Sequence, residues 1–219
     1  MSTHGFTPLA PLPAVDGVER DLCVDDARHV QVEVARYPRA AAVSPAFALE
    51  ARRVQEVRHP CLAAVVGVVV PDEAMPDDAA LVIETHAQGP RLAVGAAIPR
   101  AAALRIGADL ADALVALHGE ALVHGAVGAD AVVLDALGRP VLMGAATPLL
   151  RAAALGEEAP PLTADDDVRG LGAVLYGLVC GREPGDPPLA PASLAPTIPP
   201  ALNGLVLSLL SRDPLRPPP

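Results

Sequence analysis

The strongest folding signal in the sequence is an apolar repeat that runs from Pro99 to His118. Apolar and small residues recur there at steps of three and four, which places them on one face of a helix. The repeating residues are Leu104, Gly107, Leu110, Leu114 and Leu117. Pro99 suits the first turn of a helix, and Gly119 is well placed to end it. The repeat therefore predicts a long helix with one buried face.

The residues that follow predict a largely helical second half. Three short strands are expected at Leu122–Val123, Ala131–Leu134 and Pro140–Met143. A second amphipathic repeat, 168–180, predicts a helix that Asp166 or Asp167 caps. The proline-rich stretch 185–200 is expected to be an extended loop, and a last helix is expected at 201–211.

The first part of the chain has a different pattern, with short Val-rich segments typical of strands. Strands are expected at His29–Arg36, Leu62–Val70 and Ala80–Glu84, and Phe47–Arg58 has helical spacing. This order favours an α+β fold with two lobes, residues 1–88 and 89–219, joined by a hinge near 85–89. The two lobes together are expected to form one domain.

Charge and residue usage exclude several functions. The net charge is −10, which disfavours binding to nucleic acid or to anionic membranes. All 16 basic residues are Arg, so mechanisms that need a lysine, such as a Schiff base or a P-loop, are excluded. The cysteines, Cys23, Cys61 and Cys180, form no CxxC pair and are expected to be buried apolar residues. No signal peptide or membrane-spanning run is recognised, and a soluble cytoplasmic domain is expected.

Five segments, taken in order, resemble the bacterial, actinobacterial-type Hanks Ser/Thr protein kinases. FALEARRVQEVRHPCLAAVVGVV is similar to the αC helix and the strand after it, and LVIETHAQGPRLA is similar to the hinge region. ALRIGADLADALVALHGEALVHG resembles the helix that leads into the catalytic loop. DDDVRGLGAVLYGLVCGREP and LSRDPLRP resemble the αF helix and the final D-P-x-x-R-P segment. The resemblance implies a kinase-like fold with a small, mixed or antiparallel β N-lobe that carries αC, and a shortened, mainly helical C-lobe.

The same resemblance locates the positions where kinases hold nucleotide, and most of them differ here. The Gly-rich loop falls near residues 13–23, where Gly17 is the one glycine and Asp16, Glu19 and Asp21 surround it. Glu33 stands where active members carry the phosphate-binding Lys. Glu50 matches the αC Glu that normally pairs with that Lys. It is expected to be a solvated helix residue or to pair with a nearby Arg.

The catalytic loop reads HGAVGADA where active members read HRDLKPAN. Ala126 takes the place of the catalytic Asp, and Ala131 takes the place of the metal-binding Asn. His124 is retained. Asp130 is a nearby carboxylate at a shifted position, for which a turn or cap role is favoured over that of a base.

Later motifs are also altered. Gly144 stands where the metal-binding Asp of the DFG triplet is expected, and 159–161 matches the APE triplet without its Glu. The intervening activation segment is short and offers little platform for a peptide. Asp167 matches the αF Asp that accepts hydrogen bonds from the catalytic loop, and Arg216 matches the late structural Arg. No catalytic, cofactor-binding or metal-binding residues are therefore assigned.

These differences predict a pseudokinase, a catalytically inactive kinase-like domain with a regulatory or protein-binding role. The expected partner is a protein, such as an active Ser/Thr kinase or a phosphothreonine-binding domain, with Thr147 and Thr163 as candidate phosphorylation sites. The alternative is an atypical kinase or nucleotide-binding protein in which Arg28, Arg36 or Asp130 takes an unusual role. A further possibility is that the chain is a fragment of a longer protein.

Overall fold

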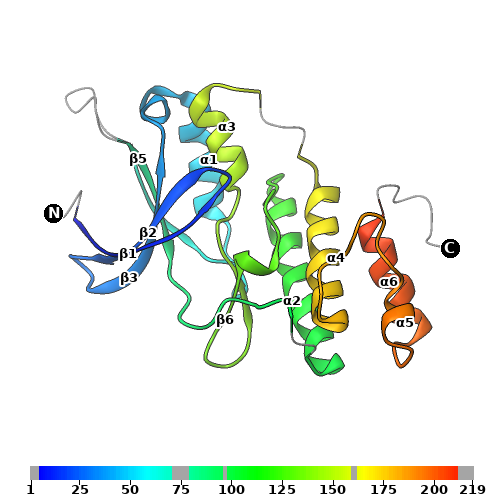
Figure 1. Ribbon diagram of the computed structural model, residues 1–219. Coiled ribbons are helices and arrows are strands. Elements are labelled where there is room, and N and C mark those ends of the chain that lie inside the picture. Colours follow the sequence, from blue (N-terminus) through cyan, green and yellow to red (C-terminus); the bar gives the residue numbers. More distant parts are fainter. Residues whose placement is uncertain (1–4, 71–78, 96–97, 159–161, 212–219) are drawn as a thin grey trace.

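The computed structural model describes residues 5–70, 79–95, 98–158 and 162–211. A five-stranded antiparallel sheet lies on one side of the molecule, and the helices α2, α4, α5 and α6 lie on the other (Figure 1). Two further helices, α1 and α3, lie side by side next to the sheet. The fold is therefore α+β, as the sequence predicts.

The strand order in the sheet is β1-β2-β3-β5-β4. The strands are β1 (Phe6–Val15), β2 (Val18–Asp25), β3 (Val30–Tyr37), β4 (Val65–Val69) and β5 (Ala80–Thr85). The three strands expected from the sequence correspond to β3, β4 and β5. The β1 and β2 strands were not individually assigned, because prolines interrupt the first pattern. A proline is tolerated in β1 since this strand forms the edge of the sheet, where its missing N–H breaks no ladder.

The alternation along the strands gives the sheet two buried faces. Cys23, Val32, Val34, Leu81 and Ile83 pack together on one face. The other face joins the main core, to which Val18, Ala35, Tyr37 and Val82 contribute. Glu33 lies between Val32 and Val34, so the period of two directs it with Ala35 toward the main core. A carboxylate thus enters an apolar interior.

The helix α1 (Pro45–Glu56) matches the helix expected at Phe47–Arg58 and follows a short 3-10 helix, η1 (Arg39–Val43). Ser44 caps α1 by accepting a hydrogen bond from the Phe47 amide at 3.2 Å. The same hydroxyl donates to the Ala153 carbonyl at 2.7 Å, which ties α1 to α3 (Thr147–Leu155). The sequence did not predict α3, because its residues were expected to form only a short activation segment.

The second half of the chain forms the helical layer. It contains α2 (Arg100–Gly119), η2 (Ala129–Ala131), the β6 (Val132–Leu134) and β7 (Pro140–Leu142) hairpin, α4 (Ala164–Cys180), α5 (Pro191–Leu194) and α6 (Pro200–Leu210). Three expectations are corrected. No strand forms at Leu122–Val123, the expected loop contains the short helix α5, and α4 begins at Ala164 with Thr163 as its N-cap. Asp166 instead reaches back to accept the Thr163 amide at 2.7 Å, which completes a capping box.

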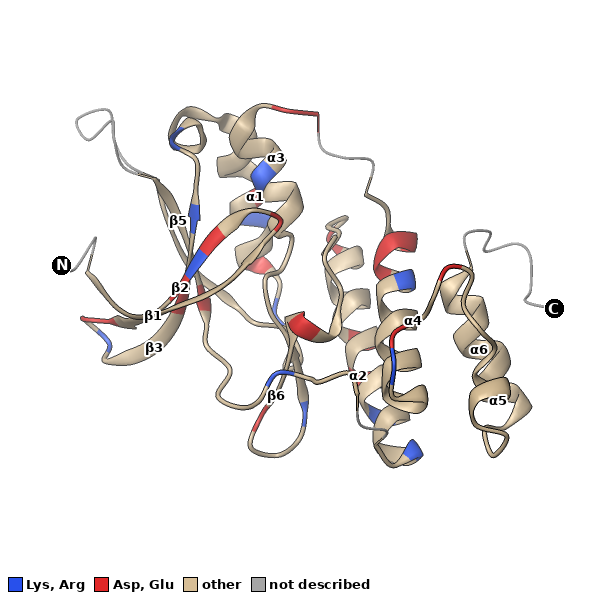
Figure 2. Cartoon of the chain, in the orientation of Figure 1, with Lys and Arg blue, Asp and Glu red and all other residues tan. Residues whose placement is uncertain are grey.

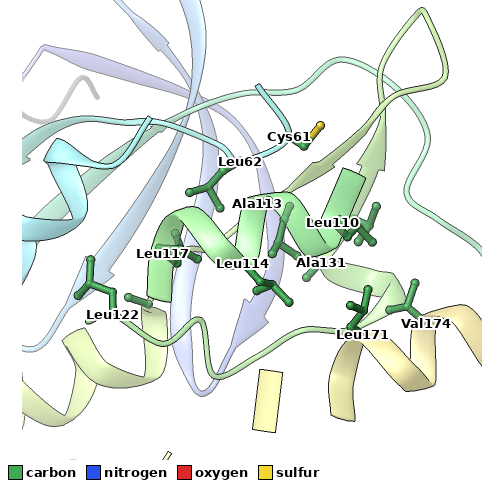
Figure 3. Close-up of a cluster of buried hydrophobic side chains, with 14 of the residues drawn as sticks. Cys61, Leu62, Leu110, Ala113, Leu114, Leu117, Leu122, Ala131, Leu171 and Val174 are labelled. Atoms are coloured by element: carbon green, nitrogen blue, oxygen red, sulfur yellow. The ribbon is translucent and has the colours of Figure 1, made fainter. Parts of the chain in front are cut away.

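Most of the α2 face predicted from its apolar repeat lies in the main core (Figure 3). Leu104 is the exception, since it is 41% exposed, and Ala103 and Ile106 are buried at that end of the helix instead. Leu110, Leu114 and Leu117 are buried in this core, with Leu110 on the side of Leu171 and Val174 of α4 and Leu117 on the side of Leu122. Gly170 allows α4 to approach the preceding loop closely, because a Cβ there would lie 2.5 Å from the Val127 carbonyl oxygen. This close approach places α4 directly beneath the loop that begins at His124.

No helix in the described ranges is both long and apolar enough to cross a bilayer.

Candidate functional site

Glu33 is buried and forms an ion pair. Its carboxylate accepts a hydrogen bond from the Arg20 guanidinium at 2.5 Å, and both side chains are 2% exposed. A buried carboxylate is costly unless it is paired, and β2 supplies the cation from the neighbouring strand. Arg28 and Arg36, to which the alternative interpretation gave an unusual role, pair in this structure with Asp25 and Asp21, respectively.

A second carboxylate, Glu84, enters the same interior from β5. Glu84 lies directly opposite Glu33 across the β3–β5 ladder, and its oxygen is 3.6 Å from the Arg20 guanidinium. The Gly144 amide donates to this carboxylate at 3.0 Å. Burial raises the pKa of Glu84 to about 7; the Glu33 charge adds to this rise, while Arg20 opposes it.

His86 completes the group at the expected hinge. Its Nδ1 atom lies 3.0 Å from the free oxygen of the Glu33 carboxylate. Arg20, Glu33, Glu84 and His86 are hereafter called the Arg20 cluster. Figure 2 shows the basic position of β2 between acidic positions of the same strand. Arg20 was not predicted as a site residue. Its one sequence signal is a charged residue two positions from both Val18 and Leu22, so that all three side chains share one face of the strand.

The loop that begins at His124 is held by Asp167 of α4. The Asp167 carboxylate is fully buried and accepts the amides of His124 at 2.8 Å and Gly125 at 2.7 Å. These are the hydrogen bonds that the resemblance implies. A third partner, His118, was not predicted, and its Nε2 atom lies 2.9 Å from the same carboxylate.

The His124 ring links this loop to the residue before Gly144. Its Nδ1 atom accepts the Ala126 amide at 3.2 Å, so the proton of the neutral ring resides on Nε2. Nε2 lies 3.1 Å from the Met143 carbonyl and donates to it. Burial lowers the pKa of His124, which keeps the ring neutral. Ala126 itself offers no side-chain group that could accept a proton.

The segment after Gly144 folds back into the interior as α3. Residues 144–148 are all buried, and Leu150 and Ala154 join the same core cluster as Phe47 of α1. The Thr147 hydroxyl donates to the Gly144 carbonyl at 2.9 Å and hydrogen-bonds the Tyr37 side chain. Thr147 is therefore inaccessible as a phosphorylation site in this structure, which corrects that expectation. Thr163, the other candidate, is exposed.

Among the described residues, Glu50 forms no ion pair with the Arg20 cluster. Its carboxylate pairs with Arg53 at 2.8 Å, one turn further along α1. Arg53 also donates to the Glu120 carbonyl at 2.5 Å, which joins α1 to the end of α2. Of the two interpretations left open by the sequence, pairing with a nearby Arg describes this residue.

Asp130 is exposed and lies in the first turn of η2, in keeping with a turn role. Its backbone carbonyl accepts a hydrogen bond from Arg91. Next to it is a cavity of about 450 Å³, bounded by the η2 turn, by α4 and by Glu183. Ala131, the next residue after Asp130, is buried and its methyl side chain offers no metal ligand.

The positions matched to the APE triplet, 159–161, and Arg216 lie outside the described residues.

The part of the chain that the structure describes contains no group of three or more His, Cys, Asp or Glu side chains that could hold a metal. An internal ion cluster surrounds Glu33, the position matched to the phosphate-binding Lys, and the segment matched to the activation segment contains the buried helix α3. Such an arrangement can fasten the sheet to the segment after Gly144. It presents no acceptor for a hydroxyl proton at Ala126 and no carboxylate at Gly144.

Four features together define the protein-kinase fold. They are the sheet with α1, the hinge that follows β5, the loop held by Asp167 of α4, and the layer of helices on the other side. Solved structures with this arrangement include the kinase domain of PknI from Mycobacterium tuberculosis, with a TM-score of 0.71, 18% identity, and coverage of 98% of this chain and 91% of that one. A C20A_R136N double mutant of the same domain gives 0.72 at 20% identity, with coverage of 96% and 89%. At this identity the likeness establishes the fold alone. No protein-family model and no curated protein matches the sequence.

Proposed function

We propose that this chain is a pseudokinase, a kinase-fold domain that acts as a regulatory or protein-binding module in the cytoplasm without transferring phosphate. The Arg20 cluster is the observation that carries this proposal. Inside the protein the Arg20 guanidinium is engaged by Glu33 and lies near Glu84, and these two carboxylates would repel the phosphates of a nucleotide.

The neighbouring positions support the same proposal. Kinases stabilise the transferred phosphoryl group with a lysine and with metal ions held by Asp and Asn side chains. This chain has no lysine, and it carries Ala126, Ala131 and Gly144 at the other three positions. The buried α3 helix adds bulk where an extended activation segment would leave room for a peptide. The retained Asp167 contacts instead stabilise the fold.

Titration with ATP tests the proposal directly. We expect no saturable rise in melting temperature with millimolar ATP, with or without Mg²⁺ or Mn²⁺, because a ligand stabilises the native state only if it binds it.

Incubation with labelled Mg-ATP and a generic acceptor protein is expected to give no transfer. Transfer by the native chain that an Asp130→Ala variant lacks would instead establish an atypical kinase. A saturable thermal shift without transfer would establish a nucleotide-binding protein.

We further propose that regulation acts through phosphorylation of Thr163 by an active Ser/Thr kinase, followed by binding of a phosphothreonine-reading domain. Thr163 is exposed at the N-terminus of α4, where the helix dipole favours a phosphate. Phosphate would also displace the Asp166 carboxylate, which now accepts the Thr163 hydroxyl at 3.0 Å. The modification would therefore alter the start of α4.

Treatment with an active bacterial Ser/Thr kinase is expected to label the native chain at Thr163, and a Thr163→Ala variant is expected to lose that label. Thr197→Ala is the matched control, because Thr197 is also an exposed threonine. Phosphopeptide mass spectrometry measures both. Undiminished label in Thr163→Ala, or no label in the native chain, would contradict this mode of regulation.

A further inference from the structure

The cavity of about 450 Å³ beside η2 has walls from four segments that are far apart in the sequence. The η2 turn forms one wall and α4 another, while Val94, after the hinge, and Glu183, after α4, form the other two. At Gly181 the chain turns back beside α4, which brings Glu183 to its wall (Figure 1). The volume lies within the range of about 300–1,000 Å³ that ligand pockets occupy. The described lining includes no member of the Arg20 cluster, so this cavity is a separate feature.

The apolar walls of the cavity are held in place by the fold. The Leu92 amide donates to the Val132 carbonyl at 2.7 Å, which fastens the segment before Val94 to β6. Val94 packs closely on α4, because a Cβ at Gly177 would lie 3.2 Å from a Val94 methyl carbon. A pocket that exists before its ligand arrives pays little for ordering on binding. The cavity is therefore preformed on this side.

The Asp130 carboxylate occupies its position because residue 128 is a glycine. A Cβ at Gly128 would lie 2.6 Å from the Asp130 Oδ1 atom, which is too close for any other side chain. In the pattern HRDLKPAN of active kinases, Lys stands at the position of Gly128 and Ala at that of Asp130. This chain has thus lost a cation and gained a carboxylate in the same turn. The negative charge beside the cavity is a property of this chain and is absent from that pattern.

The two carboxylates at the cavity, Asp130 and Glu183, are not neutralised within the described ranges, where neither forms an ion pair or accepts a side-chain hydrogen bond. Arg91 lies close by, but its guanidinium donates to the Asp130 backbone carbonyl. Arg182 precedes Glu183 and does not line the cavity. The rest of the lining is mainly apolar. Such a site suits a ligand with a cationic head on an apolar stem.

We propose that this cavity binds an arginine side chain of a partner protein, with its guanidinium at Asp130 and Glu183 and its stem against the apolar walls. A guanidinium is planar and has five N–H donors, so it can serve two carboxylates at once, whereas the lysine ammonium is compact and strongly hydrated. The net charge of −10 attracts a basic partner from a distance. The inference specifies the partner of the protein-binding role proposed above and rests on that role, but it does not depend on the absence of phosphoryl transfer.

Nuclear magnetic resonance of the isotope-labelled native chain tests the site, with a capped alanine pentapeptide that carries arginine in the middle as the probe. We expect saturable shifts of the amide signals of Gly128, Asp130 and Glu183, while signals from α1 stay in place. The same peptide with citrulline has nearly the same shape without the charge, and it should bind at least roughly tenfold more weakly. The lysine peptide should also bind more weakly, and added salt should weaken the arginine peptide because the carboxylates are exposed to solvent.

Variants separate these carboxylates from the overall charge of the protein. An Asp130→Asn, Glu183→Gln double variant should lower the association constant of the arginine peptide roughly tenfold or more. The matched control is Asp109→Asn with Asp112→Asn, which changes the net charge equally on α2, away from the cavity lining, and should have less than about a twofold effect. As a further variant, Gly128→Ala would displace the Asp130 carboxylate and weaken binding, and its extended φ of −155° accepts alanine. Circular dichroism checks that each variant is folded.

The proposal is overturned if the arginine peptide gives no saturable shift at the cavity, if the citrulline or lysine peptide binds equally well, or if the two double variants weaken binding equally. The ATP experiments described above keep this outcome apart from that of the proposed function. Phosphoryl transfer by a chain that binds the arginine peptide would overturn the pseudokinase and leave this site standing. Absence of both peptide binding and ATP binding would overturn the site and leave the pseudokinase standing.

Discussion

Replacement of Arg20 by methionine should lower the free energy of unfolding by about 3–5 kcal/mol at pH 8, because it leaves buried carboxylates without their cation. The Glu33 carboxylate would lose the Arg20 guanidinium that lies 2.5 Å from it, and the Glu84 carboxylate would lose the same cation, which lies 3.6 Å away. Methionine keeps most of the side-chain volume, so the loss reports charge rather than a cavity. Urea denaturation followed by circular dichroism measures it.

The matched control for this prediction is Arg36→Met. Arg36 also lies in the sheet and pairs with Asp21 at 3.1 Å, but its side chain is 30% exposed. Exposed pairs contribute up to about 1 kcal/mol, so the control should lose far less stability. Equal losses in the two variants would contradict a special role for the interior cluster.

Removing the carboxylate together with the cation should recover stability. In an Arg20→Met, Glu33→Met double variant, only Glu84 remains, and its pKa of about 7 already lies close to neutrality in the native chain. Protonation would leave it uncharged at modest cost, so the double variant should be more stable than Arg20→Met alone. Strictly additive losses would show that the two residues do not act as a pair.

Substitution of Asp167 by alanine is the second change with a large expected effect, with a loss of roughly 3–5 kcal/mol. The buried carboxylate accepts the amides of His124 and Gly125 and contacts His118. Alanine leaves these donors in the interior without an acceptor. The expected result is a much lower urea midpoint, with faster hydrogen exchange in the loop after Leu122.

Asp165→Ala is the control, because Asp165 is exposed in the first turn of the same helix. Its loss should be limited to the helix-dipole contribution of about 0.3–1 kcal/mol. Asp167→Asn should fall between the two, since one amide oxygen can accept only part of the donor set. If Asp167→Ala were as stable as Asp165→Ala, the loop would not depend on this contact.

The contact between Asp167 and the loop was predictable from the sequence because local signals define it. Its neighbours form a helix with a strong apolar repeat, and the motif around it resembles a known family pattern. The helices α1, α2, α4 and α6 were predicted for the same reason, since a periodic apolar face is a property of neighbouring residues. Errors there were confined to their ends, where capping by Thr163 depends on individual side chains.

The helix α3 and the Arg20 cluster were not predictable in this way. Thr147–Leu155 is short and apolar, and a short run of this kind has no distinct period until a partner surface covers it. That surface is α1, which lies about a hundred residues earlier in the chain, as the bond between Ser44 and Ala153 shows. Its helical state therefore depends on tertiary contacts.

Residue identity alone was sufficient to establish that this chain has no lysine and that Ala126, Ala131 and Gly144 occupy positions where kinases carry functional side chains. Those facts hold in any conformation. Which Arg neutralises Glu33, and that Glu84 reaches Gly144, became visible only in the folded molecule. The physical reason is that the energy of a buried charge depends on burial and on partners 13 to 60 residues away, which folding alone brings together.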